Sequence, residues 1–135
     1  LTRRCAKCWE ISEMARPSLR ILVADDDPTM GLLMRAALGG EAFALTVVDN
    51  GRVALDEFGR QTFDMVLLDV EMPEMDGMAV CAAIRRSDRP ATPVVLVTGR
   101  DDPAFALQVR ALSAELIVKP INWAALPATL LSLLG

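Results

Sequence analysis

Three carboxylates, a hydroxyl and an ammonium group each follow a short apolar run, although they are far apart along the chain. In chain order they are Asp25 and Asp26 after ILVA, Asp69 after MVLL, Thr98 after VVLV, and Lys119 after LIV. A short apolar run bounded by turn residues predicts a strand that is buried on both faces. A polar residue at its end therefore lies at the rim of a sheet, where solvent reaches it and chemistry is possible.

These five groups suit the binding and transfer of phosphate. Two carboxylates about 5 Å apart repel each other by about 3 kcal/mol at an effective dielectric constant of about 20, so three of them favour a divalent cation. Oxygen ligands without a soft ligand favour Mg²⁺, with Mn²⁺ as the next candidate. A carboxylate can attack phosphorus to form an acyl phosphate, while an ammonium group and a metal ion neutralise the developing charge. The Thr98 hydroxyl, beside Gly99 where no side chain blocks approach, can donate to the attached phosphoryl group.

Apolar runs alternate with stretches of helical periodicity, and this alternation predicts the elements that position the five groups. Strands are expected at Ile21–Ala24, Ala44–Val48, Met65–Leu68, Val94–Val97 and Leu116–Val118. Helices are expected over 28–37, 53–58, 78–86 and 103–112, and over most of the stretch after Pro120. The alternation predicts an α/β fold: a doubly wound parallel sheet with helices on both faces. Such sheets bind ligands at the carboxyl ends of their strands, where these groups stand.

Composition limits the class of protein. The 135 residues are 53% hydrophobic and 24% charged, which is typical of a single globular domain. The net charge of −4, with no basic cluster, argues against nucleic-acid binding by this domain. No apolar run approaches the length of about 18 residues that a membrane span needs, and no signal peptide is visible, so we expect no membrane contact. Three cysteines favour reduced thiols and a cytoplasmic location.

Residues 1–18 differ from the rest of the chain. They have mixed charge, no clear period and a Pro-Ser ending, which favours a flexible N-terminal extension or linker before a domain over 19–135. Cys5 and Cys8 form a CxxC pair, but no second pair and no His completes a zinc site.

Four motifs together resemble the receiver domain of two-component response regulators, of the chemotaxis-regulator type. They are ADDDP at 24–28, LLDVEMPEMDG at 67–77, VTG at 97–99 and VKP at 118–120. The resemblance covers the chain from Leu19 to about Leu134. It implies a flavodoxin-like (βα)5 sandwich whose parallel strands lie in the order 2-1-3-4-5.

The resemblance also implies a role for each site residue. Asp69 is the phosphoacceptor, and Asp26, Asp69 and the main-chain oxygen of Glu71 are the protein ligands of Mg²⁺ or Mn²⁺. Asp25 acts on the metal through water, and Gly99 leaves room for the phosphoryl group. Lys119 contacts the phosphoryl oxygens, Thr98 moves toward them, and the peptide bond from Lys119 to Pro120 is cis.

The implied partners follow from the same resemblance. The phosphoryl donor is the phosphohistidine of a sensor histidine kinase or a phosphotransfer protein, since this chain has no His. The fourth helix, fifth strand and fifth helix form the surface that switches, forms a homodimer or controls an output domain. The segment KPINW at 119–123 resembles receivers that precede diguanylate cyclase and phosphodiesterase modules, and a hybrid histidine kinase is another possible parent.

Two features near the end of the chain depart from the usual pattern. Leu116 stands where the family usually has Tyr or Phe, which puts readout through an aromatic ring in doubt. The 16 residues after Lys119 carry no charge, which favours a covered helix, either in a dimer or continuing into an output domain. Pro127 predicts that this helix starts late or is kinked.

Two alternatives from other classes remain open at this point. One is a Mg²⁺-dependent phosphohydrolase that forms an aspartyl phosphate, like the haloacid dehalogenases, although its nucleophile follows the first strand rather than the third. The other is a receiver-like interaction module that works without phosphorylation.

Overall fold

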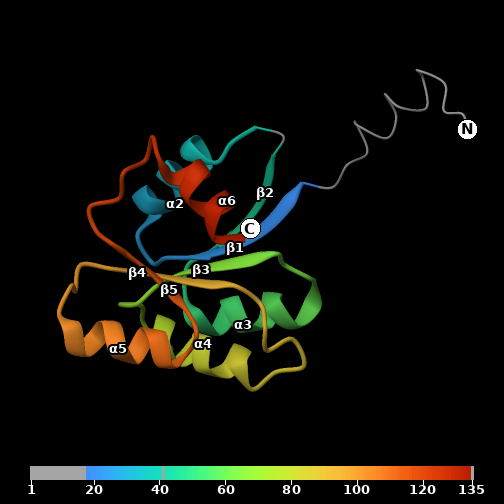
Figure 1. Cartoon of the computed structure of the whole chain (residues 1–135). Coiled ribbons are helices and arrows are strands. Elements are labelled where there is room, and N and C mark those ends of the chain that lie inside the picture. Colours follow the sequence, from blue (N-terminus) through green and yellow to red (C-terminus); the bar gives the residue numbers. More distant parts are fainter. Residues whose placement is uncertain (1–17, 41, 135) are drawn as a thin grey trace, which may run out of the picture.

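The computed structural model describes residues 18–40 and 42–134, which form five strands alternating with five helices (Figure 1). The strands are β1 (Leu19–Ala24), β2 (Phe43–Val48), β3 (Met65–Asp69), β4 (Val94–Thr98) and β5 (Glu115–Val118). The helices are α2 (Pro28–Ala37), α3 (Gly51–Arg60), α4 (Gly77–Arg85), α5 (Pro103–Ala111) and α6 (Leu126–Leu134). The proposed extension over 1–18, except its last residue, lies outside the described residues, and so do Cys5 and Cys8.

The strands form one parallel sheet in the order β2-β1-β3-β4-β5, as the resemblance implied. Figure 1 shows α2 and α6 on one face of the sheet and α3, α4 and α5 on the other. Successive strand residues point to opposite faces, so each buried strand supplies two cores. Ile21 and Val23 pack on the side of α2 and α6. Leu22 and Ala24 pack on the side of α3, α4 and α5.

Polar side chains define where four of the helices begin. Each accepts a hydrogen bond from a backbone N–H in the first turn, which would otherwise have no partner within the helix. These residues are Asp27 for α2, Asn50 for α3, Asp76 for α4 and Asp102 for α5. Proline occupies the first turn of α2 and α5, where its missing N–H costs nothing. Asp27 thus has the capping role that its position before Pro28 indicates.

Several boundaries differ from those expected. β1 begins two residues earlier, because Leu19 already pairs with Phe43 of β2. α3 begins at Gly51, two residues before the expected start at Val53. α6 begins at Leu126, so Pro127 lies in its first turn, and the late start is the outcome that the structure supports. In the described part of the chain, no helix combines the length and apolar character that crossing a bilayer requires.

Candidate functional site

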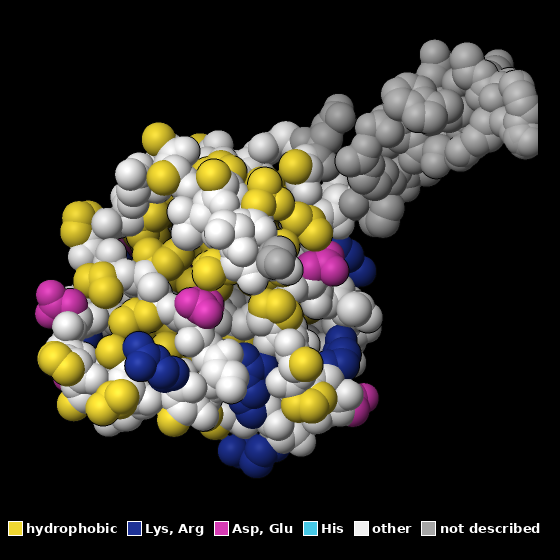
Figure 2. Space-filling view, viewed as in Figure 1, with side chains coloured by type: hydrophobic (Ala, Val, Ile, Leu, Met, Phe, Trp, Pro, Cys, Tyr) yellow, Lys and Arg dark blue, Asp and Glu magenta, His cyan; other side chains and the backbone are white. Residues whose placement is uncertain are grey.

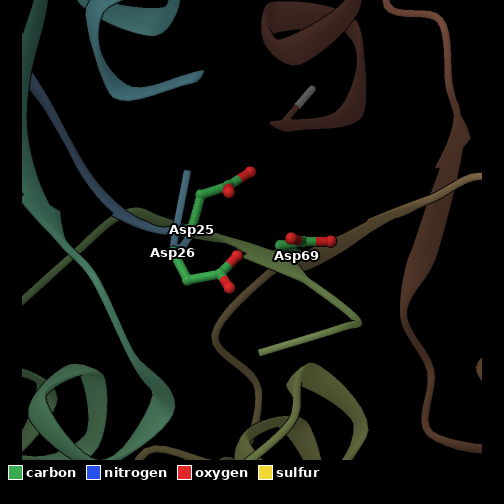
Figure 3. A group of neighbouring side chains, drawn as sticks. All are labelled: Asp25, Asp26 and Asp69. Carbon is green, nitrogen blue, oxygen red and sulfur yellow. The ribbon is translucent and has the colours of Figure 1, made fainter. Parts of the chain in front are cut away.

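The ends of β1 and β3 bring Asp25, Asp26 and Asp69 together (Figure 3). One carboxylate oxygen from each lies within 4.8 Å of the other two. Asp25 and Asp69 are buried, with 7% and 5% of their surface exposed, whereas Asp26 faces solvent. Ala24 pairs with Leu68, so Asp25, which follows β1, lies beside Asp69, the last residue of β3. The three acids expected at one rim therefore form a cluster that suits a small divalent cation.

The electrostatics of this cluster disfavour its charged form. Burial, followed by the charge of Asp25, raises the pKa of Asp69 from 3.8 to about 6, although Lys119 and the backbone N–H of Glu71 act in the opposite direction. Burial also raises the pKa of Asp25, against the backbone N–H of Asp27, which donates to Asp25 Oδ1 at 2.9 Å. Because both acids carry their charge unfavourably, a cation bound between them relieves both.

Lys119 reaches the cluster from the end of β5. Its Nζ lies 3.5 Å from Asp69 Oδ1, which is longer than a strong charged hydrogen bond. The backbone N–H of Lys119 donates to the carbonyl of Thr98 at 2.7 Å and fixes the loop beside β4. The following bond to Pro120 is cis, as the resemblance implied. Lys119 is therefore in place to contact oxygens of a group attached to Asp69.

Thr98 ends β4 and is completely buried, but its hydroxyl has partners other than Asp69. It donates to Glu71 Oε2 at 3.0 Å and accepts from the backbone N–H of Arg100 at 3.2 Å. The sequence predicted no role for the Glu71 side chain. Residue types do not show which acceptor the Thr98 hydroxyl is directed to. A Cβ added at Gly99 would meet nothing within 4 Å, so no protein contact requires glycine there.

The loop between β3 and α4 is held tightly against the sheet. The backbone N–H of Val70 donates to Val97 at 3.0 Å, and that of Gly77 donates to Val70 at 3.0 Å. A Cβ at Gly77 would lie 2.5 Å from the carbonyl oxygen of Asp69, so only glycine allows this approach. Met72 in this loop is buried and packs in the core on the side of α3, α4 and α5. The loop thus fixes the backbone on both sides of Asp69.

Two hollows adjoin the acidic cluster and share Asp26. One, of about 580 Å³, is lined by Asp26, Arg100 and five residues of the β3–α4 loop, among them Glu71 and Asp76. The other, of about 630 Å³, lies between α2 and the β2–α3 turn, where Val47 and Val53 form apolar walls. Both hollows reach the cluster at Asp26, whereas Asp69 lines neither of them.

The comparisons with known proteins identify the family. The model for the response regulator receiver domain matches residues 21–131. The chain belongs to this family. It is 35% identical over 118 residues to the transcriptional regulatory protein ZraR of Escherichia coli, covering 87% of this chain and 26% of ZraR. The chain thus spans about a quarter of that relative.

Solved receiver structures have the same fold. The chemotaxis response regulator CheY4 of Vibrio cholerae matches with a TM-score of 0.80 and 26% identity, covering 86% of this chain and 98% of that one. A structure described as the BeF3-activated DrrB receiver domain matches with a TM-score of 0.78 and 27% identity, covering 87% and 97%. The resemblance seen in the sequence motifs and the predicted strand order are thereby confirmed. This is a signalling domain of two-component systems rather than a member of a catalytic family.

Proposed function

We propose that Asp69 accepts a phosphoryl group from a phosphohistidine and that the attached group switches the domain. A carboxylate oxygen of Asp69 attacks phosphorus and the P–N bond breaks, leaving its electron pair on the imidazole nitrogen, which takes a proton from water. Water later attacks the same phosphorus and releases phosphate and the free carboxylate. The observation that carries this proposal is the meeting of three carboxylates within 4.8 Å, with the Lys119 ammonium group 3.5 Å from one of them.

The donor set fits Mg²⁺ or Mn²⁺. Asp26, Asp69 and the main-chain oxygen of Glu71 would hold the ion, and Asp25 would act through water, so that every ligand is a hard oxygen. When bound, the ion neutralises charge on the phosphoryl oxygens. Lys119 donates to those oxygens, Gly99 leaves room for them, and the loop held by Gly77 keeps Asp69 oriented for in-line attack.

The partners follow from this chemistry. A sensor histidine kinase or a phosphotransfer protein supplies the phosphohistidine, in the cytoplasm. The relative ZraR is named as a transcriptional regulator and is much longer than this chain, which supports an output module under the control of this domain. A diguanylate cyclase or phosphodiesterase module, or a hybrid kinase, remains a narrower proposal that depends on the segment at 119–123.

The decisive test of phosphorylation is chemical. The protein is incubated with Mg²⁺ and acetyl phosphate, and its intact mass is measured. We expect the gain of one phosphate in the wild type and in Asp56→Ala, an exposed acid of α3, but not in Asp69→Ala. A gain in both the wild type and Asp69→Ala, or in neither, contradicts the assignment. Turnover of a phosphate ester would instead support the phosphohydrolase alternative.

We also propose that the surface formed by α5, β5 and α6 carries the output. It presents three exposed apolar side chains, one from each element: Leu107 at 62%, Val118 at 38% and Leu131 at 47% exposure. Figure 2 shows hydrophobic side chains over the part of this face where α6 lies, and α6 has no charged residue. A second copy of the domain would cover such a surface after phosphorylation.

Sedimentation with and without beryllofluoride tests this surface. We expect the mimic to shift the wild type toward a dimer, and Leu131→Lys to prevent the shift. Leu32→Lys on α2 is the matched control, because Leu32 is 68% exposed but lies on a different element. Equal loss in the two variants would mean that added charge alone, rather than this surface, governs association.

A further inference from the structure

The hydrogen bonds of Thr98 define a resting position for its side chain. Thr98 is fully buried, and a hydroxyl has one proton to donate. That proton is directed to Glu71 Oε2 at 3.0 Å, while the Arg100 N–H at 3.2 Å occupies the acceptor side. A buried hydroxyl needs an acceptor, and in this structure the Glu71 carboxylate supplies it. In this position the hydroxyl cannot also donate to a group attached to Asp69.

We propose that the Glu71 side chain is a latch that holds Thr98 in its resting position, so that a phosphoryl group at Asp69 must compete with it for the hydroxyl proton. This inference rests on the proposed phosphorylation of Asp69. Glu71 lies two residues after Asp69 in the same loop, and its backbone N–H is 3.4 Å from Asp69 Oδ1. The two competing acceptors therefore stand on one short segment, whose backbone is fixed against β4 and α4.

The competition has an electrostatic part as well. A phosphoryl group carries close to two negative charges, so its arrival sets like charges on Asp69 and Glu71 near each other. The charge of Glu71 already acts on Asp69, since it is one of the influences that raise the pKa of that carboxyl group. Because Glu71 is exposed and lines the hollow shared with Asp26 and Arg100, its carboxylate has space to swing away once it loses Thr98.

Beryllofluoride binding with Mg²⁺, measured by titration calorimetry, tests the latch. Glu71→Met keeps the length of the side chain but removes the acceptor, and we expect about threefold to tenfold tighter apparent binding, the scale of one partly exposed charged hydrogen bond. Glu74→Met is the matched control. This variant removes one negative charge from the same loop, at a side chain that is also exposed. We expect its affinity to equal that of the wild type.

A double-mutant cycle separates the hydrogen bond from simple charge repulsion. In a Thr98→Val background there is no hydroxyl to hold, so a latch predicts that the effect of Glu71→Met on the affinity shrinks to the part that charge repulsion alone supplies. An undiminished effect in that background, or no effect in the wild-type background, would overturn the latch.

A measurement without any ligand completes the test. We expect the NMR signal of the Thr98 methyl group to shift in ligand-free Glu71→Met and to stay unchanged in Glu74→Met. An unchanged signal in both variants would contradict the resting contact. If the wild type binds no beryllofluoride at all, the phosphoacceptor proposal fails, and the latch fails with it. If the wild type binds beryllofluoride and Glu71→Met binds it equally well, only the latch is contradicted and the phosphoacceptor proposal stands.

Discussion

Replacing Asp69 by Asn should stabilise the protein when no metal is present, although it removes the proposed phosphoacceptor. The Asp69 carboxylate is 5% exposed and lies within 4.8 Å of oxygens of Asp25 and Asp26. Asn has nearly the same shape and keeps an acceptor for the Glu71 N–H, but it carries no charge. The substitution therefore removes repulsion and desolvation at little cost in packing.

Two routes give the size of this gain. One pair of charges at 4.8 Å repels by about 3 kcal/mol at an effective dielectric constant of about 20. The rise of the Asp69 pKa from 3.8 to about 6 corresponds to about 3 kcal/mol as well, with the attraction of Lys119 already included. Allowing for solvent around Asp26, we expect a gain of about 1–3 kcal/mol in the free energy of unfolding at pH 7. For a domain of this size the melting temperature rises by about 3–6 °C per kcal/mol.

The pH dependence follows from the sign of the pKa shift. The folded protein holds the Asp69 proton more tightly than the unfolded chain does, so this group contributes stability below pH 3.8 that is lost as the pH rises to about 6. Metal-free wild-type protein should therefore melt at a higher temperature at pH 5 than at pH 7. The stability advantage of Asp69→Asn over the wild type should be smaller at pH 5 than at pH 7, because Asp69 of the folded wild type is largely protonated at pH 5.

Calorimetry in EDTA at pH 5 and pH 7, repeated with Mg²⁺, checks these expectations. Mg²⁺ should stabilise the wild type more than Asp69→Asn, since it binds the folded cluster and the variant has lost one ligand. Asp56→Asn, on the exposed side of α3, should stay within about 0.5 kcal/mol of the wild type in every condition. An Asp69→Asn protein that is less stable than the wild type at pH 7 in EDTA would refute the reasoning about repulsion.

Further predictions concern the scaffold, and thermal unfolding measures each of them. Gly51→Ala should destabilise by about 3 kcal/mol, since its Cβ would lie 2.1 Å from the Met75 carbonyl oxygen. In the same helix, Gly59→Ala meets nothing within 4 Å and should stabilise by about 0.5–1 kcal/mol, so a loss there would contradict the contact argument. Arg85→Met should cost about 2 kcal/mol without changing phosphorylation, because Arg85 donates to four carbonyls, among them those of Leu112 and Thr92 at 2.7 Å. Stability unchanged in this variant would mean that water replaces those bonds at no cost.

The sequence predicts the acidic cluster because the rule behind it is topological. Parallel strands joined by helices end at one edge of the sheet, so Asp25 and Asp69 had to meet once both strands were recognised. The same rule placed Lys119 and Thr98 at that edge. Periodicity located the helices well, although α3 begins at Gly51 rather than at Val53, where the apolar pattern starts.

Contacts that depend on rotamers and loop paths could not be predicted. Nothing in the residue types says that the Thr98 hydroxyl is directed to Glu71 rather than to Asp69, because either carboxylate is a suitable acceptor. The need for glycine at 51 is also hidden, since it arises from the Met75 carbonyl, which folds back from a loop 24 residues further on. Such contacts are set by the path of the β3–α4 loop, which only coordinates reveal.

The structure also bears on how a signal can leave the site without an aromatic ring at position 116. Leu116 packs against the core on the side of α3, α4 and α5, so it offers no ring that could change places with Thr98. The Arg100 N–H donates to Thr98, its guanidinium group pairs with Asp102 at 3.2 Å, and its Cζ lies 4.3 Å from the centre of the Phe105 ring. Asp102 caps α5, and Phe105 is buried in its first turn. A displacement of Thr98 would therefore reach the start of α5 through Arg100 and its contacts. Helix α5 is part of the proposed output surface.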